Sequence, residues 1–589
     1  MKRVIKRAVS FVLVFMTVFS VFTILPSEVF HTAYVKAAEM FSSETGASTQ
    51  ETYTTDDFTY TLIDEYSKVQ ILSYIGSDTD VVIPDRIDNK KVTSIADSAF
   101  REKSITSVVF GQYVESIGNY AFYGCQSLSK LDFSKSSVKT IGSYAFVMDK
   151  SITTLEFPDS LESIGNYTFS CYRYGTYGSY VANSLKSVKF GSGLKTIGQY
   201  AFYENQKLET IEFTGNSLTS IENNAFYDCL ALKEVNLTGN NAVIGDYAFY
   251  NNDALQKITL SGVKTIGSYA FGYGDSLKNV SLGEGLVSVK NNAFQNCFNL
   301  ETANFSDSLT TISNYAFDNC RKLTEIDIPS KVETLSGYAF SNCSALKNVS
   351  IGSGCTSISS TAFLNSYAIE KIDVAEDNKN YASVDGALLN KEKTSIVLYP
   401  KNKQGEFVIP DTVTTIADYA FNNAPNLTKV TIGANVKTIG TCAFQNCNSL
   451  ETVIFKDSDT VTKTIGDYAF NNCPTLTTVD FGNAVKSIGS YAFMIDKSLE
   501  NIEFPDSLES IGNYAFSCYR YGTYGSYVAN SLKSVKFGSG LKTIGQYAFY
   551  ENQKLETIEF TGNSLTSIEN NAFYDCLALK EVNLTGNNA

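Results

Sequence analysis

The stretch from Ser184 to Leu208 reads SLKSVKFGSGLKTIGQYAFYENQKL, and its spacing decides the fold. Val188 and Phe190 alternate with polar residues, which is the period of a strand buried on one face. A Gly then turns the chain, and a second short apolar step ends at Ile197. Residues 200–202 suit one helical or 3-10 turn, with Ala packed closely and Phe in the centre. The stretch therefore predicts one small coil around a buried Phe.

The Ala-Phe pair of this coil returns along most of the chain, usually at intervals of 22 to 24 residues. A coil this short cannot bury its apolar face alone, so it must stack on its neighbours. The pattern predicts an α/β repeat solenoid with parallel β-strands, short helical turns and a ladder of Phe rings. Nineteen such coils, at about 4.8 Å each, would extend roughly 90 Å along the curve. The predicted ladder residues are Phe100, Phe122, Phe146, Phe169, Phe202, Phe226, Phe249, Phe271, Phe294, Phe317, Phe340, Phe363, Phe421, Phe444, Phe470, Phe493, Phe516, Phe549 and Phe573.

The shared pattern of these units is L-x-x-I-x-[FIL]-[PG]-x-x-[VL]-x-x-I-G-x-x-A-F-x-x-C, and it runs from about Val92 to Ala589. This pattern, and its Ile-Gly-x-Tyr-Ala-Phe core above all, resembles the BspA-type leucine-rich repeat. The resemblance implies a right-handed leucine-rich-repeat superhelix on an exported protein. It also implies a role in adhesion, including attachment to host or matrix proteins and to other cells.

The first 38 residues have the order of a secretory signal peptide. Four basic residues among the first seven precede an apolar stretch from Ala8 to Leu25, and Ala37 and Ala38 offer a cleavage site. The alternative is a retained membrane anchor, because the apolar run is long enough to span a bilayer. Export is the favoured interpretation. We therefore expect a secreted or cell-surface protein whose mature chain does not insert into the membrane.

The rest of the chain divides into five segments. Residues 39–55 are rich in Ser, Thr and Glu and predict a flexible tether. Residues 56–91 alternate strands and turns without the Ala-Phe pair, which suits a β-rich N-terminal cap. Residues 92–375 form the first array of leucine-rich repeats and residues 411–589 the second. Between them, residues 376–410 contain an Asp-Gly turn between apolar runs and predict a β-hairpin insert.

One block of the first array is repeated without change in the second. The 74 residues from Phe169 to Ala242 reappear from Phe516 to Ala589. Physical convergence does not produce such identity, so the block was copied. The second copy stops in the middle of a unit, so we expect the second array to be C-terminally incomplete.

Composition disfavours several classes of function. The chain carries 47 Lys and Arg against 61 Asp and Glu, a net charge of -14, so its surface repels nucleic acid and anionic lipid. The single histidine, His31, lies in the predicted signal peptide. The mature protein then has no imidazole for a Ser-His-Asp or Cys-His pair or for a zinc site. We expect no enzyme, no cofactor, no metal site and no nucleic-acid partner.

Paired carboxylates are the catalytic chemistry that remains. Glu212, Asp327 and Asp373 occupy outward strand positions, in register with Asn236 and other small polar residues. An open sheet face exposed to water requires such a column, so we interpret it as a solvated face, with catalysis as the alternative. Glu212, Asn236 and Asp327 are predicted to contact a binding partner.

A longer interval after Phe169, and its copy after Phe516, holds tyrosines and an arginine between glycines. Such residues at glycine joints are typical of adaptable binding loops. The alternative is a solvent loop whose tyrosines lie back on the coil edge. The predicted binding residues are Tyr172, Arg173, Tyr174, Tyr177 and Tyr180 and their copies Tyr519, Arg520, Tyr521, Tyr524 and Tyr527.

Two further columns follow the repeat. Ten of the twelve cysteines stand two or three residues after a ladder Phe, and we interpret them as buried core thiols, with disulfides or metal ligands as alternatives. A Tyr precedes Ala-Phe in many coils and should form a stripe on the coil edge. Packing between coils explains this stripe, and an aromatic track for glycan or protein is the alternative.

Two hypotheses for function follow. The first is an exported scaffold, expected to be a monomer, for adhesion or protein-ligand binding, whose partner is an extracellular protein of a host matrix or cell surface. The second is a glycan-binding or spacer module of a larger surface protein or enzyme whose other domain lies beyond residue 589.

Overall fold

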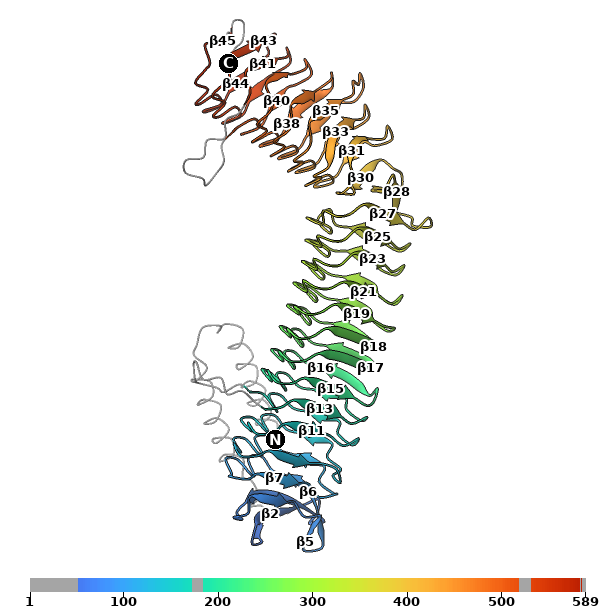
Figure 1. Ribbon diagram of the computed structural model, residues 1–589, viewed down its shortest axis with the longest axis vertical. Helices are drawn as coiled ribbons and strands as arrows, with labels where there is room; N and C mark the ends of the chain where they lie inside the picture. Colours follow the sequence, from blue (N-terminus) through green and yellow to red (C-terminus); the bar gives the residue numbers. More distant parts are fainter. Residues whose placement is uncertain (1–50, 172–183, 519–530, 583, 585–589) are drawn as a thin grey trace, which may run out of the picture.

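The computed structural model describes residues 51–171, 184–518, 531–582 and 584, which form a curved stack of coils (Figure 1). The predicted signal peptide and most of the predicted tether lie outside these residues. Most coils contribute one strand to each of two columns, and most strands of each column pair in parallel with those of the next coil. The chain is therefore a parallel β-solenoid, as the repeat predicts.

The strands of the first column are two to six residues long, apart from two strands, described below, that continue into the second column. They are β4 (Asp80–Val82), β7 (Ser107–Val109), β9 (Lys130–Asp132), β11 (Thr154–Glu156), β13 (Ser187–Phe190), β15 (Thr210–Phe213), β19 (Asn279–Leu282), β21 (Thr302–Asn304), β23 (Glu325–Ile328), β25 (Asn348–Ile351), β27 (Lys371–Val374), β31 (Gly405–Val408), β33 (Leu427–Ile432), β35 (Thr452–Phe455), β37 (Thr478–Asp480), β39 (Asn501–Glu503), β41 (Ser534–Phe537), β43 (Thr557–Phe560) and β45 (Glu581–Val582).

The second column holds short strands that end on a buried Ile or its equivalent in most coils. They are β6 (Lys90–Ile95), β8 (Ser116–Ile117), β10 (Thr140–Ile141), β12 (Ser163–Ile164), β14 (Thr196–Ile197), β16 (Leu218–Ile221), β20 (Ser288–Val289), β22 (Thr311–Ile312), β24 (Thr334–Leu335), β26 (Ser357–Ile358), β30 (Ser395–Leu398), β32 (Thr415–Ile416), β34 (Thr438–Ile439), β36 (Lys463–Ile465), β38 (Val485–Ile488), β40 (Ser510–Ile511), β42 (Thr543–Ile544) and β44 (Ser567–Ile568). Two strands, β17 (Glu234–Ile244) and β18 (Lys257–Ile266), run through both columns.

The Ala-Phe segment closes each coil without a helix, which corrects the predicted α/β class. Tyr200 and Glu204 have positive φ angles of 56° and 58°. Between these left-handed residues, the Phe202 N–H donates to the Ala225 carbonyl of the next coil at 2.8 Å. A helix would direct this donor to a carbonyl of its own coil. The described residues contain turns at these positions and no helix, so the fold is an all-β solenoid.

The predicted Phe ladder is present as a column of stacked rings. In the first array the rings stack from Phe100 to Phe363, with centroids 4.6 Å apart for Phe100 and Phe122 and 5.0 Å apart for Phe226 and Phe249. The rings are fully buried or nearly so. Each coil thus places one aromatic ring where only the next coil can cover it.

The insert separates two buried clusters, one built mainly from the first array and one mainly from the second. Its hairpin consists of β28 (Tyr381–Val384) and β29 (Ala387–Asn390), joined by Asp385 and Gly386 with φ angles of 53° and 76°. Two left-handed residues in succession are what a two-residue hairpin turn requires. Tyr399 stacks on Phe421 at 4.6 Å and so begins the second ring column. Figure 1 shows the stack bending at this point.

Antiparallel strands cover the N-terminal end of the first array. They are β1 (Thr52–Thr54), β2 (Phe58–Ile63) and β3 (Lys68–Tyr74), with β5 (Arg86–Ile87) paired to β6. Tyr74 stacks on Phe100 with centroids 5.4 Å apart. The first ring of the ladder is therefore shielded from water by a ring that belongs to no repeat.

Candidate binding surface

The outward face of the first strand column is a regular surface that runs along the solenoid. Its side chains lie in register over most of its length, because most strands pair with the equivalent residues of the next coil. Asn236 pairs with Thr259 of β18, which pairs with Ser281 of β19. Asp327 of β23 pairs with Ser350 of β25. These rows present small hydrogen-bonding groups at the strand spacing of about 4.8 Å.

The three strand residues predicted to bind lie on this face. Glu212 on β15, Asn236 on β17 and Asp327 on β23 are all exposed. The structure places them in one file along the solenoid and does not gather them at one point. Five strand steps separate Glu212 from Asp327, about 24 Å, which is too far for two carboxylates to share one bond.

Asp327 and Asp373 are closer, two strand steps or about 10 Å apart. Both are exposed, and Asp373 lies 2.7 Å from the ammonium of Lys371. They lack the apolar, water-excluding surroundings in which a carboxylic acid serves as a general acid. The arrangement suits a hydrated surface.

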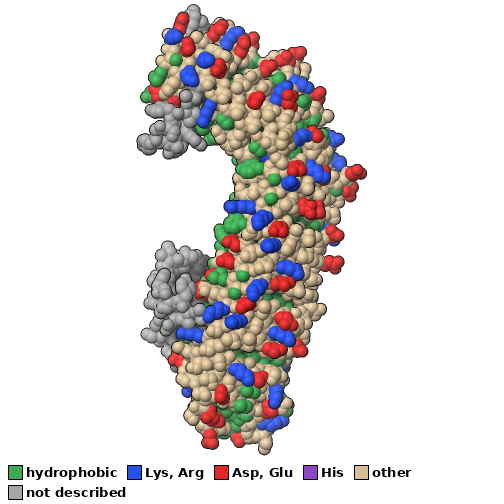
Figure 2. Space-filling view, in the orientation of Figure 1, with side chains coloured by type: hydrophobic (Ala, Val, Ile, Leu, Met, Phe, Trp, Pro, Cys, Tyr) green, Lys and Arg blue, Asp and Glu red, His purple; other side chains and the backbone are tan. Residues whose placement is uncertain are grey.

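Ion pairs connect neighbouring coils across this face. Lys189 lies 3.3 Å from Glu156, and Lys429 lies 3.1 Å from Glu406. Figure 2 shows basic and acidic side chains interspersed over the visible face. Exposed pairs contribute only about 0–1 kcal/mol each. These pairs therefore determine the charge pattern of the surface and contribute little to the stability of the fold.

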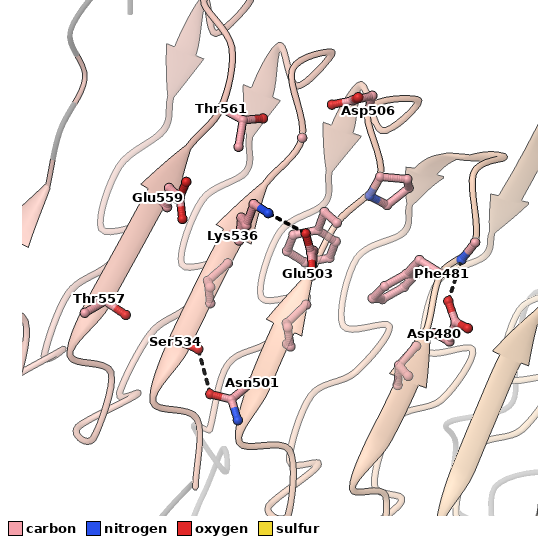
Figure 3. A pocket seen from close by; sticks show the side chains of 17 residues that line it. Asp480, Phe481, Asn501, Glu503, Asp506, Ser534, Lys536, Thr557, Glu559 and Thr561 are labelled. Atoms are coloured by element: carbon pink, nitrogen blue, oxygen red, sulfur yellow. Dashed lines mark hydrogen bonds and ion pairs between the residues drawn. The ribbon is translucent and has the colours of Figure 1, made fainter.

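Near the C-terminal end the face is hollowed over β37, β39, β41 and β43 (Figure 3), with a volume of about 1080 Å³. Lys536 points toward Glu503, with 2.6 Å between the ammonium and a carboxylate oxygen. The Ser534 hydroxyl donates to the Asn501 side chain at 2.6 Å. The hollow is polar, open and lined by strand residues of four successive coils.

The tyrosines that precede Ala-Phe form a half-buried column at the coil edge. Tyr144 stacks on Tyr167 with centroids 4.8 Å apart and planes 7° apart, and Tyr167 on Tyr200 at 4.6 Å and 8°. Their φ angles are positive, between 56° and 59°. Neighbouring rings cover both faces of an inner tyrosine such as Tyr167. A sugar stacks on an open ring face, so an inner ring of this column offers only its edge and hydroxyl.

The cysteines at the third position after the ladder Phe have a role that the sequence analysis missed. The Cys125 thiol donates to the Phe100 carbonyl of the preceding coil at 3.0 Å, and the Cys297 thiol to Phe271 at 3.2 Å. Burial raises the pKa of each of these two thiols to about 12, which keeps the donor proton in place. In another coil the Ser366 hydroxyl makes the same bond.

Among the described residues, the cysteines at this position form no disulfide. They are Cys125, Cys229, Cys297, Cys320, Cys343, Cys447, Cys473 and Cys576. The column therefore consists of hydrogen-bond donors that satisfy a buried carbonyl. The recurrence of Asn and Ser at the same position, as at Asn205 and Ser366, was the signal that could have revealed it.

Two coils carry an aspartic acid at this position. Asp149 and Asp496 are 2% and 3% exposed, and burial raises the pKa of both well above the usual range. The Cys473 N–H donates to Asp496 at 2.6 Å. A carboxyl that stays protonated keeps an O–H donor, as the thiols of the other coils do. Both residues therefore lie in the core of the solenoid.

The predicted binding loops cannot be placed. Tyr172, Arg173, Tyr174, Tyr177 and Tyr180 and their copies Tyr519, Arg520, Tyr521, Tyr524 and Tyr527 lie outside the described residues. Within the described ranges, no group of three or more His, Cys, Asp or Glu residues could hold a metal ion. No helix in the same ranges is long and apolar enough to cross a bilayer.

Parallel coils, a buried ring ladder and a polar outer strand face define a leucine-rich-repeat solenoid. The chain belongs to the BspA-type leucine-rich repeat family. The family model, described as a BspA type leucine rich repeat region of six copies, matches residues 93–178, 175–282, 264–383, 397–520 and 522–589. This membership confirms the resemblance seen in the sequence. No curated protein sequence matches the chain.

Several solved structures are similar. A leucine rich repeat protein of T. pallidum is 26% identical, with 35% of this chain and 91% of that chain covered and a TM-score of 0.30. A leucine rich cell surface protein of Faecalibacterium prausnitzii is 21% identical, with 88% and 97% covered and a TM-score of 0.29. A leucine-rich repeat protein of Bacteroides ovatus is 22% identical, with 86% and 94% covered and a TM-score of 0.32.

Proposed function

We propose that this protein is an exported, non-catalytic cell-surface module for adhesion or protein-ligand binding, and that it holds its partner on the outward face of the first strand column. One observation carries the proposal. Exposed Asn, Thr, Ser and Asp side chains follow this face in register from coil to coil. Such side chains supply adaptable hydrogen bonds at protein interfaces.

Location at the cell surface rests on the order of charges, apolar residues and small residues at the N-terminus. A similar structure is that of a protein described as a leucine rich cell surface protein. An extracellular protein of a host matrix or of another cell is the partner that fits this location. Nucleic acid does not fit, because the net charge of -14 repels phosphate.

A glycan partner is the competing possibility. The stacked tyrosines weigh against it, since the inner rings of the column have no open face for a sugar. The outward strand face offers hydroxyl and amide groups and no aromatic platform over rows such as that from Asn236 to Ser281. A protein surface, which needs hydrogen bonds more than a stacking platform, fits this face better.

The test is capture of proteins and polysaccharides by the immobilised chain. Ser281→Arg adds bulk and charge to the outward face, whereas Thr334→Arg adds the same group to the exposed second column and serves as the control. We expect bound matrix or cell-surface proteins to be lost with Ser281→Arg and kept with Thr334→Arg. Capture of polysaccharides alone, or equal loss in both variants, would contradict the proposal.

A third variant tests the predicted tyrosine loops. Residues 172–183 and 519–530 are replaced by Gly and Ser, and the same capture is repeated. Protein capture that survives this change assigns binding to the strand face. Capture that disappears, while Ser281→Arg retains it, assigns binding to the loops.

A further inference from the structure

The copied block builds the same surface at two places. Identity extends upstream of the block to Glu156 and Glu503, with a single difference, Thr168 against Ala515. The contacts repeat as well. Asp159 accepts from the Ser192 N–H at 2.8 Å, and Asp506 accepts from the Ser539 N–H at 2.7 Å. Equal sequences in equal coils thus present equal side chains to solvent.

We define two patches on the outward strand face. The first patch is formed by Asp132, Glu156, Asp159, Lys189 and Glu212, on or just after β9, β11, β13 and β15. The second patch is formed by Asp480, Glu503, Asp506, Lys536 and Glu559, on or just after β37, β39, β41 and β43. In both, the glutamates flank the lysine in register on the neighbouring strands. The second patch lines the hollow of Figure 3.

Each patch has four carboxylates and one ammonium, and the ammonium is already engaged. Lys189 pairs with Glu156 at 3.3 Å and Lys536 with Glu503 at 2.6 Å. In the described part of the chain, no ion pair or hydrogen bond reaches the carboxylates of Glu212 and Glu559. Both side chains are exposed. Each patch therefore ends in an exposed carboxylate that can meet a cation from outside, although Lys536 also attracts Glu559.

We infer that the chain is bivalent, and that each patch binds a Lys- or Arg-bearing protein segment. The inference rests on the proposed function, which it deepens by naming the charge of the partner. The choice of occupant follows from charge complementarity, because acidic patches attract basic segments and repel anionic ones. The flanking glutamates lie two strand spacings apart, about 10 Å, so one segment can engage both.

The two patches cannot share one short segment. At about 4.8 Å per coil they lie roughly 70 Å apart along the curve. Figure 1 places β11 to β15 in the lower part of the stack and β41 to β43 at its upper end. A surface that displays many copies of one basic segment can occupy both patches at once. Linked sites raise apparent affinity on the order of 100-fold or more over one site.

The patches differ at one neighbouring position. The first has Lys130 on β9 beside Asp132, where the second has Thr478 on β37 beside Asp480. An added ammonium repels a basic segment, so the second patch is the tighter of the two. This difference lets each patch be recognised in a titration.

The experiment titrates the full chain with decalysine, which spans at most about 34 Å and cannot bridge the patches. Calorimetry at low salt should give two peptides bound per chain. Glu212→Gln should leave one tight site and Glu559→Gln one weaker site. On beads densely coated with decalysine, each variant should dissociate about 10- to 100-fold faster than the unchanged chain.

Glu325→Gln is the matched control, since it makes the same change at one exposed carboxylate of β23, on the same face and outside both patches. This variant should still bind two decalysine peptides and should dissociate from the coated beads as slowly as the unchanged chain. Equal loss in Glu325→Gln and Glu559→Gln would overturn the inference, because binding would then follow overall charge. The inference would also be overturned if the unchanged chain bound only one decalysine, or if it bound decaglutamate as tightly as decalysine. Failure of the capture experiment with intact two-site titration would instead remove the proposed function and leave bivalency standing.

Discussion

The Phe column and the Tyr column run through the same turn of each coil, yet the Phe column varies far less. The turn of each repeat carries a Phe, which is buried in most coils, and Tyr399 takes its place at the insert. Two residues earlier, the left-handed position is Tyr in most coils and another residue in some. The other residues with positive φ there are Ser98, Asn224, Asn292, Cys442 and Asn571. Burial therefore fixes identity, whereas an edge position requires only a residue that tolerates its backbone.

Truncation of a ladder ring should produce the largest effect. Phe271 is fully buried between Phe249 and Phe294, with centroids 5.2 and 5.3 Å away. Phe271→Ala should lower the free energy of unfolding by about 3–5 kcal/mol, because it leaves a cavity that neighbouring coils cannot fill. Urea unfolding followed by circular dichroism measures the loss. Phe271→Leu fills part of that cavity and should cost less, and an equal cost in both would show that the loss comes from ring stacking and not from the cavity.

The buried aspartic acids should make stability depend on pH. Burial raises the folded-state pKa of Asp496 above its unfolded value, so its contribution is full below about pH 4 and is lost as pH rises toward the folded pKa. Asp496→Asn keeps a donor and cannot ionise. It should raise the free energy of unfolding by on the order of 2 kcal/mol at pH 8 and little at pH 4.

Asp480→Asn is the control for this prediction, because Asp480 is exposed on β37. Unfolding midpoints measured from pH 4 to pH 8 should fall less steeply for Asp496→Asn than for the unchanged chain. A pH profile that is the same in both proteins would show that Asp496 does not ionise on unfolding.

Loss of one donor at the cysteine position should have a smaller effect. The Cys320 thiol donates to the Phe294 carbonyl at 3.4 Å. Cys320→Ala leaves that buried carbonyl without this donor and should cost about 1–3 kcal/mol. Cys320→Ser keeps a donor, as Ser366 does in another coil, and should cost less. If the two variants unfold at the same denaturant concentration, the thiol acts by volume alone.

Substitution in the edge column should have the smallest effect. Tyr269 stacks on Tyr247 at 4.8 Å and has a φ of 56°. Tyr269→Asn loses the ring stacking, which contributes about 0.5–1.5 kcal/mol. Asn tolerates the left-handed backbone better, which should regain part of the roughly 1–2 kcal/mol that this conformation costs. The two effects offset each other. The thermal midpoint should shift by only a few degrees. Tyr269→Val, which tolerates this backbone poorly, should shift it further.

The stacking of coils could be predicted from the sequence because one buried residue, the ladder Phe, repeats at a nearly constant interval. The closure of the coil could not. The segment from Tyr200 to Glu204 is compatible with a helical turn, and a Tyr gives no sign that its φ is positive. Only the asparagines at the same position in other coils, Asn224, Asn292 and Asn571, point to a left-handed backbone.

The candidate surface was predicted in part. The outward positions of Glu212, Asn236 and Asp327 follow from the alternation of each strand, because side chains on a strand point to opposite faces. The patches could not be found this way, since they depend on which strands pair. Register places Glu503 and Glu559 on either side of Lys536, and register is a property of the stack and not of one repeat.

The division of the core at the hairpin insert has a mechanical consequence. Force applied along the arc is carried by contacts between successive coils, and two separate buried clusters meet at the insert. We expect this junction to yield before either array does, so that the two halves part while each stays folded. In a protein that is held at one end and pulled at the other, this junction would then open first. The molecule would lengthen while the binding surfaces of both arrays stay folded.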